Sequence, residues 1–180
     1  MSSKDGKIFE ENIKKSADKQ DIYCERIKDS ASSFGQDSDF TKYTVKNPYD
    51  FIFFNDRCYF PSELKSTSMS SISIQRTNKD KSAGKMIKYH QIKGLKKGID
   101  YDFIYPSFLL DFRVTNNTYY LSIEDFLRFL KESDKKSINE KDVVKYGGII
   151  INKKLLIKNY EYNLKEIFNS NIINKLEGEK

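Results

Sequence analysis

Residues 49–65 contain two extended segments separated by a short turn, and no other part of the chain constrains the fold as strongly. Residues 49–54 are a run of aromatic and β-branched side chains interrupted only by one aspartate (YDFIFF), and residues 58–65 form a second extended segment. Between them, residues 55–57 (Asn-Asp-Arg) favour a turn. Two such runs joined by a short polar turn predict a β-hairpin.

The segments around this hairpin alternate between helical and extended patterns. Phe9, Ile13 and Ala17 recur every fourth residue and predict a helix over residues 6–19. The other predicted elements, in chain order, are a loop at 29–39, a loop at 66–84 with an irregular strand at 71–75, a helix at 85–96 ended by Gly98, strands at 108–114 and 118–121 joined by a turn at Asn116 and Asn117, a helix from Ser122 to 132 with Asp125 completing its capping box, a strand at 149–151, and a last helix containing Leu164, Ile167, Phe168 and Leu176. This order predicts a single α/β domain of residues 1–180, with a mixed central β-sheet flanked by helices. Residues 1–5 and 177–180 are expected to be disordered.

Composition indicates a folded protein that does not cross a membrane. Of the 180 residues, 38% are hydrophobic and 32% are charged, and 12 Tyr and 13 Phe make the chain too aromatic for a disordered one. No apolar run approaches the roughly 20 residues that span a bilayer, and no apolar signal sequence follows Met1, so we expect a cytoplasmic protein without a membrane partner. Cys24 and Cys58 lack the spacing of a metal site or disulfide framework, and we expect free thiols.

Positive charge is concentrated between residues 66 and 97. The whole chain has a net charge of +6, and this segment contains eight basic residues against the single acid Asp80. Lys96 and Lys97 end the segment, and the candidate DNA-binding residues are Arg76, Lys79, Lys81, Lys85, Lys88 and Lys93. Such a concentration suits a polyanion, because each neutralised phosphate releases condensed counterions. A solvated Lys-rich loop is the alternative interpretation.

Asp50, Glu63 and Lys65 are the candidate catalytic residues. Asp50 lies near the start of the first hairpin strand, while Glu63 and Lys65, two residues apart in the second, point to the same face. Two carboxylates form a hard oxygen site that suits Mg²⁺ or Mn²⁺. The cation would polarise a scissile phosphate and lower the pKa of a bound water, and Lys65 would orient that water or stabilise the developing charge. Alternatively, Glu63 and Lys65 form an exposed ion pair and Asp50 is only a strand-edge residue.

Three further polar residues bear on this hypothesis. Glu10 falls at the edge of the apolar face of the first helix and could reach the site, whereas Glu11 points to water. Gln91 belongs to the predicted second helix and, taken alone, indicates a buried polar residue with a structural partner. His90 is the single histidine of the chain, and a surface or phosphate-contacting position is its more common role than that of a general base.

Ordered motifs extend over nearly the whole chain. They are GKIFE at 6–10, YDFIFF with Asp50, ELKS with Glu63 and Lys65, YHQIKGL with His90 and Gln91, LDFR at 110–113, and KSI at 136–138. In this set and order the chain resembles the RecU-type Holliday junction resolvases, especially their compact phage-borne forms.

The resemblance implies a restriction-endonuclease-like fold, a homodimer, and Mg²⁺-dependent paired nicks placed symmetrically across a four-way DNA junction in recombination and repair. By the same resemblance Asp50 and Glu63 are metal ligands, Lys65 is the catalytic lysine, Glu10 assists at the metal, and Gln91 lines the site. Two other hypotheses remain open. One is a nuclease of the same fold that cuts duplex DNA, and the other is a non-catalytic DNA-binding protein in which the acids are incidental.

Overall fold

A computed structural model of the protein describes residues 4–27 and 47–170. Its helices are α1 (Lys4–Lys19), α2 (Tyr89–Lys96), α3 (Ile123–Glu132) and α4 (Glu140–Lys145), and a further helix covers residues 164–170. Its strands are β1 (Tyr23–Arg26), β2 (Phe51–Asn55), β3 (Cys58–Thr67), β4 (Ser71–Ser73), β5 (Ser107–Phe112), β6 (Asn117–Ser122), β7 (Ser137–Asn139), β8 (Ile149–Ile150), β9 (Lys153–Leu155) and β10 (Tyr160–Tyr162). The predicted loop at 29–39, Leu176 and residues 177–180 lie outside the described residues.

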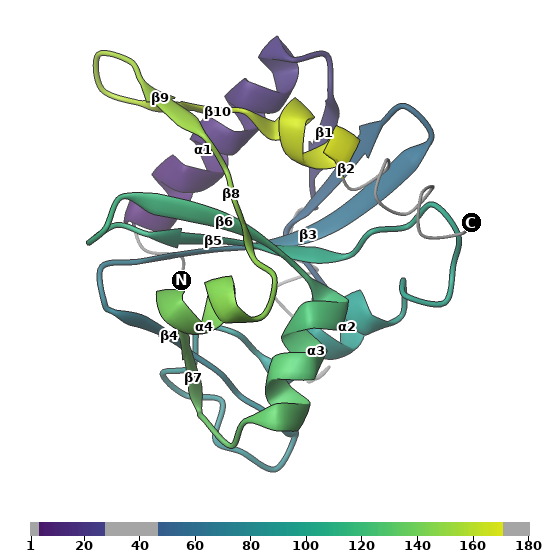
Figure 1. Cartoon of the computed structure of the whole chain (residues 1–180), viewed down its shortest axis with the longest axis vertical. Coiled ribbons are helices and arrows are strands. Elements are labelled where there is room, and N and C mark those ends of the chain that lie inside the picture. Colours follow the sequence, from purple (N-terminus) through teal and green to yellow (C-terminus); the bar gives the residue numbers. More distant parts are fainter. Residues whose placement is uncertain (1–3, 28–46, 171–180) are drawn as a thin grey trace, which may run out of the picture.

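The centre of the structure is a six-stranded mixed sheet with the order β1-β2-β3-β5-β6-β8. β3 and β5 pair in parallel, whereas the other neighbouring strands are antiparallel. Helices and two small two-stranded sheets cover the two faces of this central sheet (Figure 1). The prediction of an α/β fold with a mixed central sheet flanked by helices is therefore confirmed.

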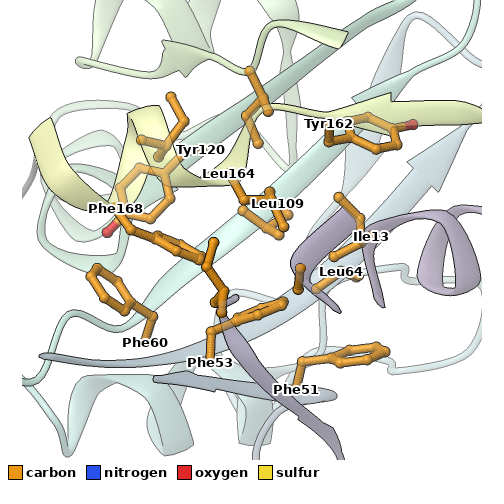
Figure 2. Close-up of a cluster of buried hydrophobic side chains, with 14 of the residues drawn as sticks. Ile13, Phe51, Phe53, Phe60, Leu64, Leu109, Tyr120, Tyr162, Leu164 and Phe168 are labelled. Carbon is orange, nitrogen blue, oxygen red and sulfur yellow. The ribbon is translucent and has the colours of Figure 1, made fainter. Parts of the chain in front are cut away.

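α1, the β9–β10 hairpin and the helix at 164–170 cover one face of the sheet (Figure 1). Phe9, Ile13 and Ala17, which the sequence predicts on one helical face, are all buried there. They pack in a core with side chains from β2, β3 and β5 (Figure 2). In this core the rings of Phe60 and Phe168 stack with their centroids 4.2 Å apart.

α2, α3, α4 and the β4–β7 sheet lie on the opposite face (Figure 1). Along β5, Leu109 packs in the first core, whereas Phe108 and Leu110 pack in this second one, as the alternation of a strand requires. All six residues of β5 are buried because the strand is covered on both faces, which explains why four of them are Phe or Leu. The two cores also orient β3: Leu64 packs on the α1 side, so its neighbour Glu63 points to the α2 side.

The hairpin predicted at 49–65 is confirmed as β2 and β3. Their register runs from Phe51 opposite Ser62 to Asn55 opposite Cys58. Asp56, in the turn, has a φ of 55°, a left-handed conformation that Asp adopts more readily than most residues. β3 continues to Thr67, beyond the predicted end, because its parallel pairing with β5 continues that far.

The helix predicted at 85–96 begins only at Tyr89. The backbone N–H groups of Met86 and Ile87 donate to the carbonyl oxygen of Ser73 at 3.1 and 2.9 Å, and Ile87 forms a β-bridge with Ile74. Pairing with the β4 segment therefore replaces the first predicted helical turn. Ile87 is buried by this extended pairing and not by a helical face.

Several smaller predictions can also be compared with the structure. α1 begins at Lys4, within the stretch expected to be disordered. The N-cap of α3 is confirmed, because Oγ of Ser122 accepts a hydrogen bond from the backbone N–H of Asp125 at 3.1 Å. Cys24 and Cys58 are both free thiols, as expected. None of the helices in the described parts of the chain is long and apolar enough to cross a membrane.

Candidate active site

Asp50 and Glu63 lie side by side at the open end of the β2–β3 hairpin. Asp50 directly precedes β2, and the register of the two strands places it level with Glu63. The backbone N–H of Leu64 donates to Oδ2 of Asp50 at 3.2 Å. This hydrogen bond fixes the Asp50 carboxylate against β3.

Lys65 connects the two carboxylates. It lies on the same face of β3 as Glu63, forms an ion pair with Oε1 of Glu63, and places its Nζ 3.9 Å from Oδ2 of Asp50. The side chain of Lys65 is 15% exposed and that of Glu63 is 0% exposed. The pair is therefore buried, in contrast to the exposed ion pair of the alternative interpretation.

Gln91 reaches the same cluster from α2. Its side-chain Nε2 donates to Oε1 of Glu63, and its Oε1 accepts a hydrogen bond from the backbone N–H of Lys88 at 2.8 Å. The second bond belongs to the N-terminal capping box of α2. Gln91 is partly buried, has a structural partner on its own helix and also contacts Glu63, and its role in the candidate site stays a prediction.

One carboxylate oxygen of Glu63 is left without a partner. Oε1 is bound by Lys65 and Gln91, but Oε2 is buried and accepts no hydrogen bond from the described residues. Burial raises the pKa of Glu63 well above its ordinary value of 4.5, although the charge of Lys65 opposes this shift. Because folding raises this pKa, the contribution of Glu63 to stability falls as the pH rises above 4.5.

Glu10 lies at the edge of the cluster. Burial alone would lower the pKa of Lys65, but the charges of Glu63 and Asp50, with a smaller contribution from Glu10, raise it. The Oε2 atom of Glu10 accepts a hydrogen bond from Nε of Arg26 at 2.8 Å.

Within residues 4–27 and 47–170, no group of three or more His, Cys, Asp or Glu side chains is arranged to hold a metal ion. Asp50 and Glu63 are thus a pair of candidate ligands and not a complete set.

Gly94 holds α2 against the segment that carries Asp50. A Cβ atom at Gly94 would lie 2.3 Å from Cβ of Pro48 and 2.9 Å from its backbone oxygen. Only a glycine permits this approach without a shift of one of the two segments. Pro48 is two residues before Asp50 and Gly94 is one helical turn after Gln91, so this contact sets the distance between the two site residues. Sequence reasoning did not single out Gly94, although a glycine inside a predicted helix is a signal of close packing.

The basic residues of the segment 66–97 have different environments. Arg76 donates to the carbonyl oxygens of Leu130, Ser133 and Lys135, at and beyond the end of α3. Nζ of Lys88 donates to the carbonyl oxygen of Ser82. The side chains of Lys79, Lys81 and Lys93 are exposed, and that of Lys85 is partly buried. The exposed lysines are therefore better placed to meet a polyanion than Arg76.

Replacing Arg76 with methionine is expected to lower the free energy of unfolding by about 1–3 kcal/mol, because three carbonyl groups lose their donor. The measurement is urea denaturation, with Lys79→Met as the control, for which we expect a change within about 0.5 kcal/mol. DNA binding over a range of salt concentrations completes the test. Weaker DNA binding with unchanged stability would show instead that Arg76 contacts phosphate.

No family model matches the chain. The chain is similar to the SPbeta prophage-derived uncharacterized protein YotM of Bacillus subtilis (strain 168), with 37% identity over 146 residues. The alignment covers 77% of this chain and 69% of that protein.

Proposed function

The chain belongs to the same family as the prophage-derived protein YotM, and we propose that it is a Mg²⁺-dependent endonuclease that resolves four-way DNA junctions. The proposal rests on the buried Glu63 carboxylate, which has one unpartnered oxygen and lies beside Asp50 and Lys65. A carboxylate pair with an adjacent ammonium is a suitable arrangement for phosphodiester hydrolysis. The RecU-type resemblance supplies the substrate class, and the prophage origin of YotM agrees with the phage-borne forms that the chain resembles.

The residues of the site fit a divalent cation. A buried polar atom without a partner is rare, and such an atom often marks the position of an ion or a water. Oε2 of Glu63 is an atom of this kind, and Asp50 adds a second carboxylate. Carboxylate oxygens together with water and phosphate oxygens are the usual ligands of Mg²⁺. Asp50 and Glu63 would therefore hold Mg²⁺, or Mn²⁺, with Glu10 assisting from α1.

Different residues of the chain would have different roles at the scissile phosphate. Bound Mg²⁺ supplies charge neutralisation at the phosphate and a coordinated water of lowered pKa. Lys65 presents an ammonium group at the same carboxylates, where it can stabilise the negative charge that develops on the phosphate. Gln91 orients Glu63 through its amide, and the backbone N–H of Leu64 orients Asp50. The protein thus holds both carboxylates in place before a substrate binds.

The remaining parts of the proposal concern the fold, the partner and the assembly. A mixed central sheet with helices on both faces is compatible with the restriction-endonuclease-like fold that the resemblance implies. α2 carries both Gln91 and the exposed Lys93, so DNA that follows the basic side chains would pass close to the site. A homodimer would supply two such sites for paired nicks, and we propose the cytoplasm as the location.

Asp50→Asn is expected to reduce nicking of a labelled four-way junction by about 100-fold or more in Mg²⁺. The amide keeps the size of the side chain but removes one carboxylate from the site. Nicking is measured on denaturing gels beside a linear duplex of the same sequence. Asp56→Asn is the matched control, because Asp56 lies exposed in the turn at the other end of the hairpin with a φ of 55°, which Asn also tolerates.

Each possible outcome supports or contradicts one of the hypotheses. Symmetric junction nicks by the wild type and Asp56→Asn, but not by Asp50→Asn, support the resolvase. Equal cutting of the linear duplex indicates a duplex nuclease of the same fold. Normal nicking by Asp50→Asn contradicts the assigned site. Binding of the junction without nicking by any of the three proteins indicates a non-catalytic DNA-binding protein.

A further inference from the structure

A second candidate site lies on the α1 side of the sheet. A cavity of about 280 Å³ opens between the N-terminal half of α1, the ends of β3 and β5, and the β9–β10 hairpin. β3 and β5 are the parallel pair of the central sheet, and their carboxyl ends border the cavity. The carboxyl ends of parallel strands are a common position for ligand sites in α/β proteins.

The floor of this cavity is a buried polar network. Asp111 on β5 accepts hydrogen bonds from Ser66 at 2.7 Å and Thr118 at 2.8 Å, and it pairs with Lys153 at 3.4 Å. Nζ of Lys153 also lies 4.6 Å from the ring centroid of Tyr160. Burial lowers the pKa of Lys153, although Asp111 opposes the shift. The network pairs its opposite charges internally, so the floor presents no unpaired charge to a ligand.

Asn12 gives the cavity an unused hydrogen-bonding group. It is 5% exposed and lines the cavity from α1, yet its side-chain amide forms no hydrogen bond within the described residues. The amide therefore faces the cavity, where a ligand can bind it. An amide offers one acceptor and two donors, and this combination matches the edge of a nucleobase. The aromatic side chains of Phe9, Tyr160 and Tyr162 supply flat apolar walls.

The mouth of the cavity contains a guanidinium group that already binds an anion. Arg113 forms an ion pair with the carboxylate of Asp5, in the first turn of α1. Both side chains remain accessible, with 31% of Arg113 and 54% of Asp5 exposed. A phosphate group can therefore replace Asp5 on Arg113, because guanidinium binds phosphate and carboxylate with the same paired geometry.

We propose that this cavity binds one nucleotide, with its base against Asn12 and its phosphate on Arg113. The cavity would suit other planar ligands that have hydrogen-bonding groups on their edge, and the choice of a nucleotide rests on the proposed nuclease function. The cavity and the candidate active site lie on opposite faces of the sheet, although Phe9 and Ser66 of the cavity are sequence neighbours of Glu10 and Lys65. The ligand is either a free mononucleotide or a nucleotide unpaired from the DNA strand.

Binding of the four deoxynucleoside 5′-monophosphates to the full chain, measured by calorimetry in EDTA, tests this proposal without cleavage. Inorganic phosphate and 2-deoxyribose 5-phosphate serve as ligands without a base. A short single-stranded oligonucleotide that carries one 2-aminopurine, followed by fluorescence, tests the nucleotide within a strand. We expect at least one monophosphate, or the oligonucleotide base, to bind at least about tenfold more tightly than its base-free counterpart.

Asn12→Leu is the decisive variant. Leucine has nearly the shape of asparagine and removes the amide that faces the cavity, so we expect a melting temperature close to that of the wild type together with at least about tenfold weaker binding. Arg113→Gln is expected to weaken binding of the monophosphates and not of free nucleosides. Lys154→Gln, an exposed change on the same hairpin, should leave binding unchanged. Asp50→Asn should also retain binding, even if it no longer nicks DNA.

Two outcomes would overturn the proposal. The first is the absence of base-dependent binding by both the monophosphates and the oligonucleotide. The second is binding that persists in Asn12→Leu. If the protein bound nucleotides but did not nick junctions, the result would contradict the proposed nuclease function and would still support nucleotide binding in the cavity.

Discussion

Lys65→Met is expected to reduce junction nicking by about 10²–10³-fold and, at the same time, to increase the stabilisation of the protein by Mg²⁺. In the structure the ammonium group of Lys65 lies between the carboxylates of Glu63 and Asp50. Removing it takes away a charge that can stabilise the reacting phosphate. It also leaves two carboxylates near each other without their counter-charge, so these carboxylates attract a divalent cation more strongly.

The stability of Lys65→Met provides a readout that is independent of cleavage. Without metal, the variant is expected to lose up to about 3–5 kcal/mol, because a buried ion pair loses one partner. A cation that binds the folded state raises stability in proportion to the logarithm of its concentration over its dissociation constant. The melting temperature should therefore rise more with added Mg²⁺ in the variant than in the wild type.

Lys93→Met is the matched control for this experiment. Lys93 is exposed on α2 and forms no part of the carboxylate cluster. We expect its Mg²⁺ dependence to equal that of the wild type, with weaker DNA binding as the only effect. If Mg²⁺ stabilised Lys65→Met and the wild type equally, Lys65 and the metal would not share the same carboxylates.

The candidate site was predictable because most of its geometry is local. A hairpin register and the two-residue alternation of a strand are enough to place Asp50, Glu63 and Lys65 together. Helical periodicity likewise placed Glu10 at the edge of the apolar face of α1. The burial of Glu63 was not predictable in this way, because it depends on α2, which is packed over β3 from a distant part of the sequence.

The sequence does not reveal contacts between segments that lie far apart in the chain. The sequence predicts a start of α2 at residue 85, which is wrong because the pairing of Ile87 with Ile74 has no signature in the local pattern. The charge of Arg76 predicts a DNA contact, which stays a prediction, but the hydrogen bonds from its guanidinium to carbonyl groups near the end of α3 could not be inferred from the sequence. The Asp111 and Lys153 pair joins β5 to β9, and no spacing rule connects residues so far apart.

Gly94→Ala tests whether the distance between α2 and Asp50 matters. Helix propensity alone predicts that this change stabilises α2 by about 1 kcal/mol. The structure predicts the opposite sign, because the new methyl group would lie 2.3 Å from Cβ of Pro48. We expect the free energy of unfolding to fall by about 1–3 kcal/mol, as in other overpacked sites. We also expect slower nicking, because any outward shift of α2 moves Gln91 away from Glu63.

Urea denaturation decides between the two signs, and Lys93→Ala provides the control one position earlier on the same helix. Since Lys93 is exposed, we expect its replacement to change stability by less than about 0.5 kcal/mol. A Gly94→Ala protein that is more stable than the wild type would mean that α2 and Pro48 do not approach closely. In that case the position of Gln91 over Glu63 would have to be fixed by the capping box of α2 and by the packing of Ile92 and Leu95 alone.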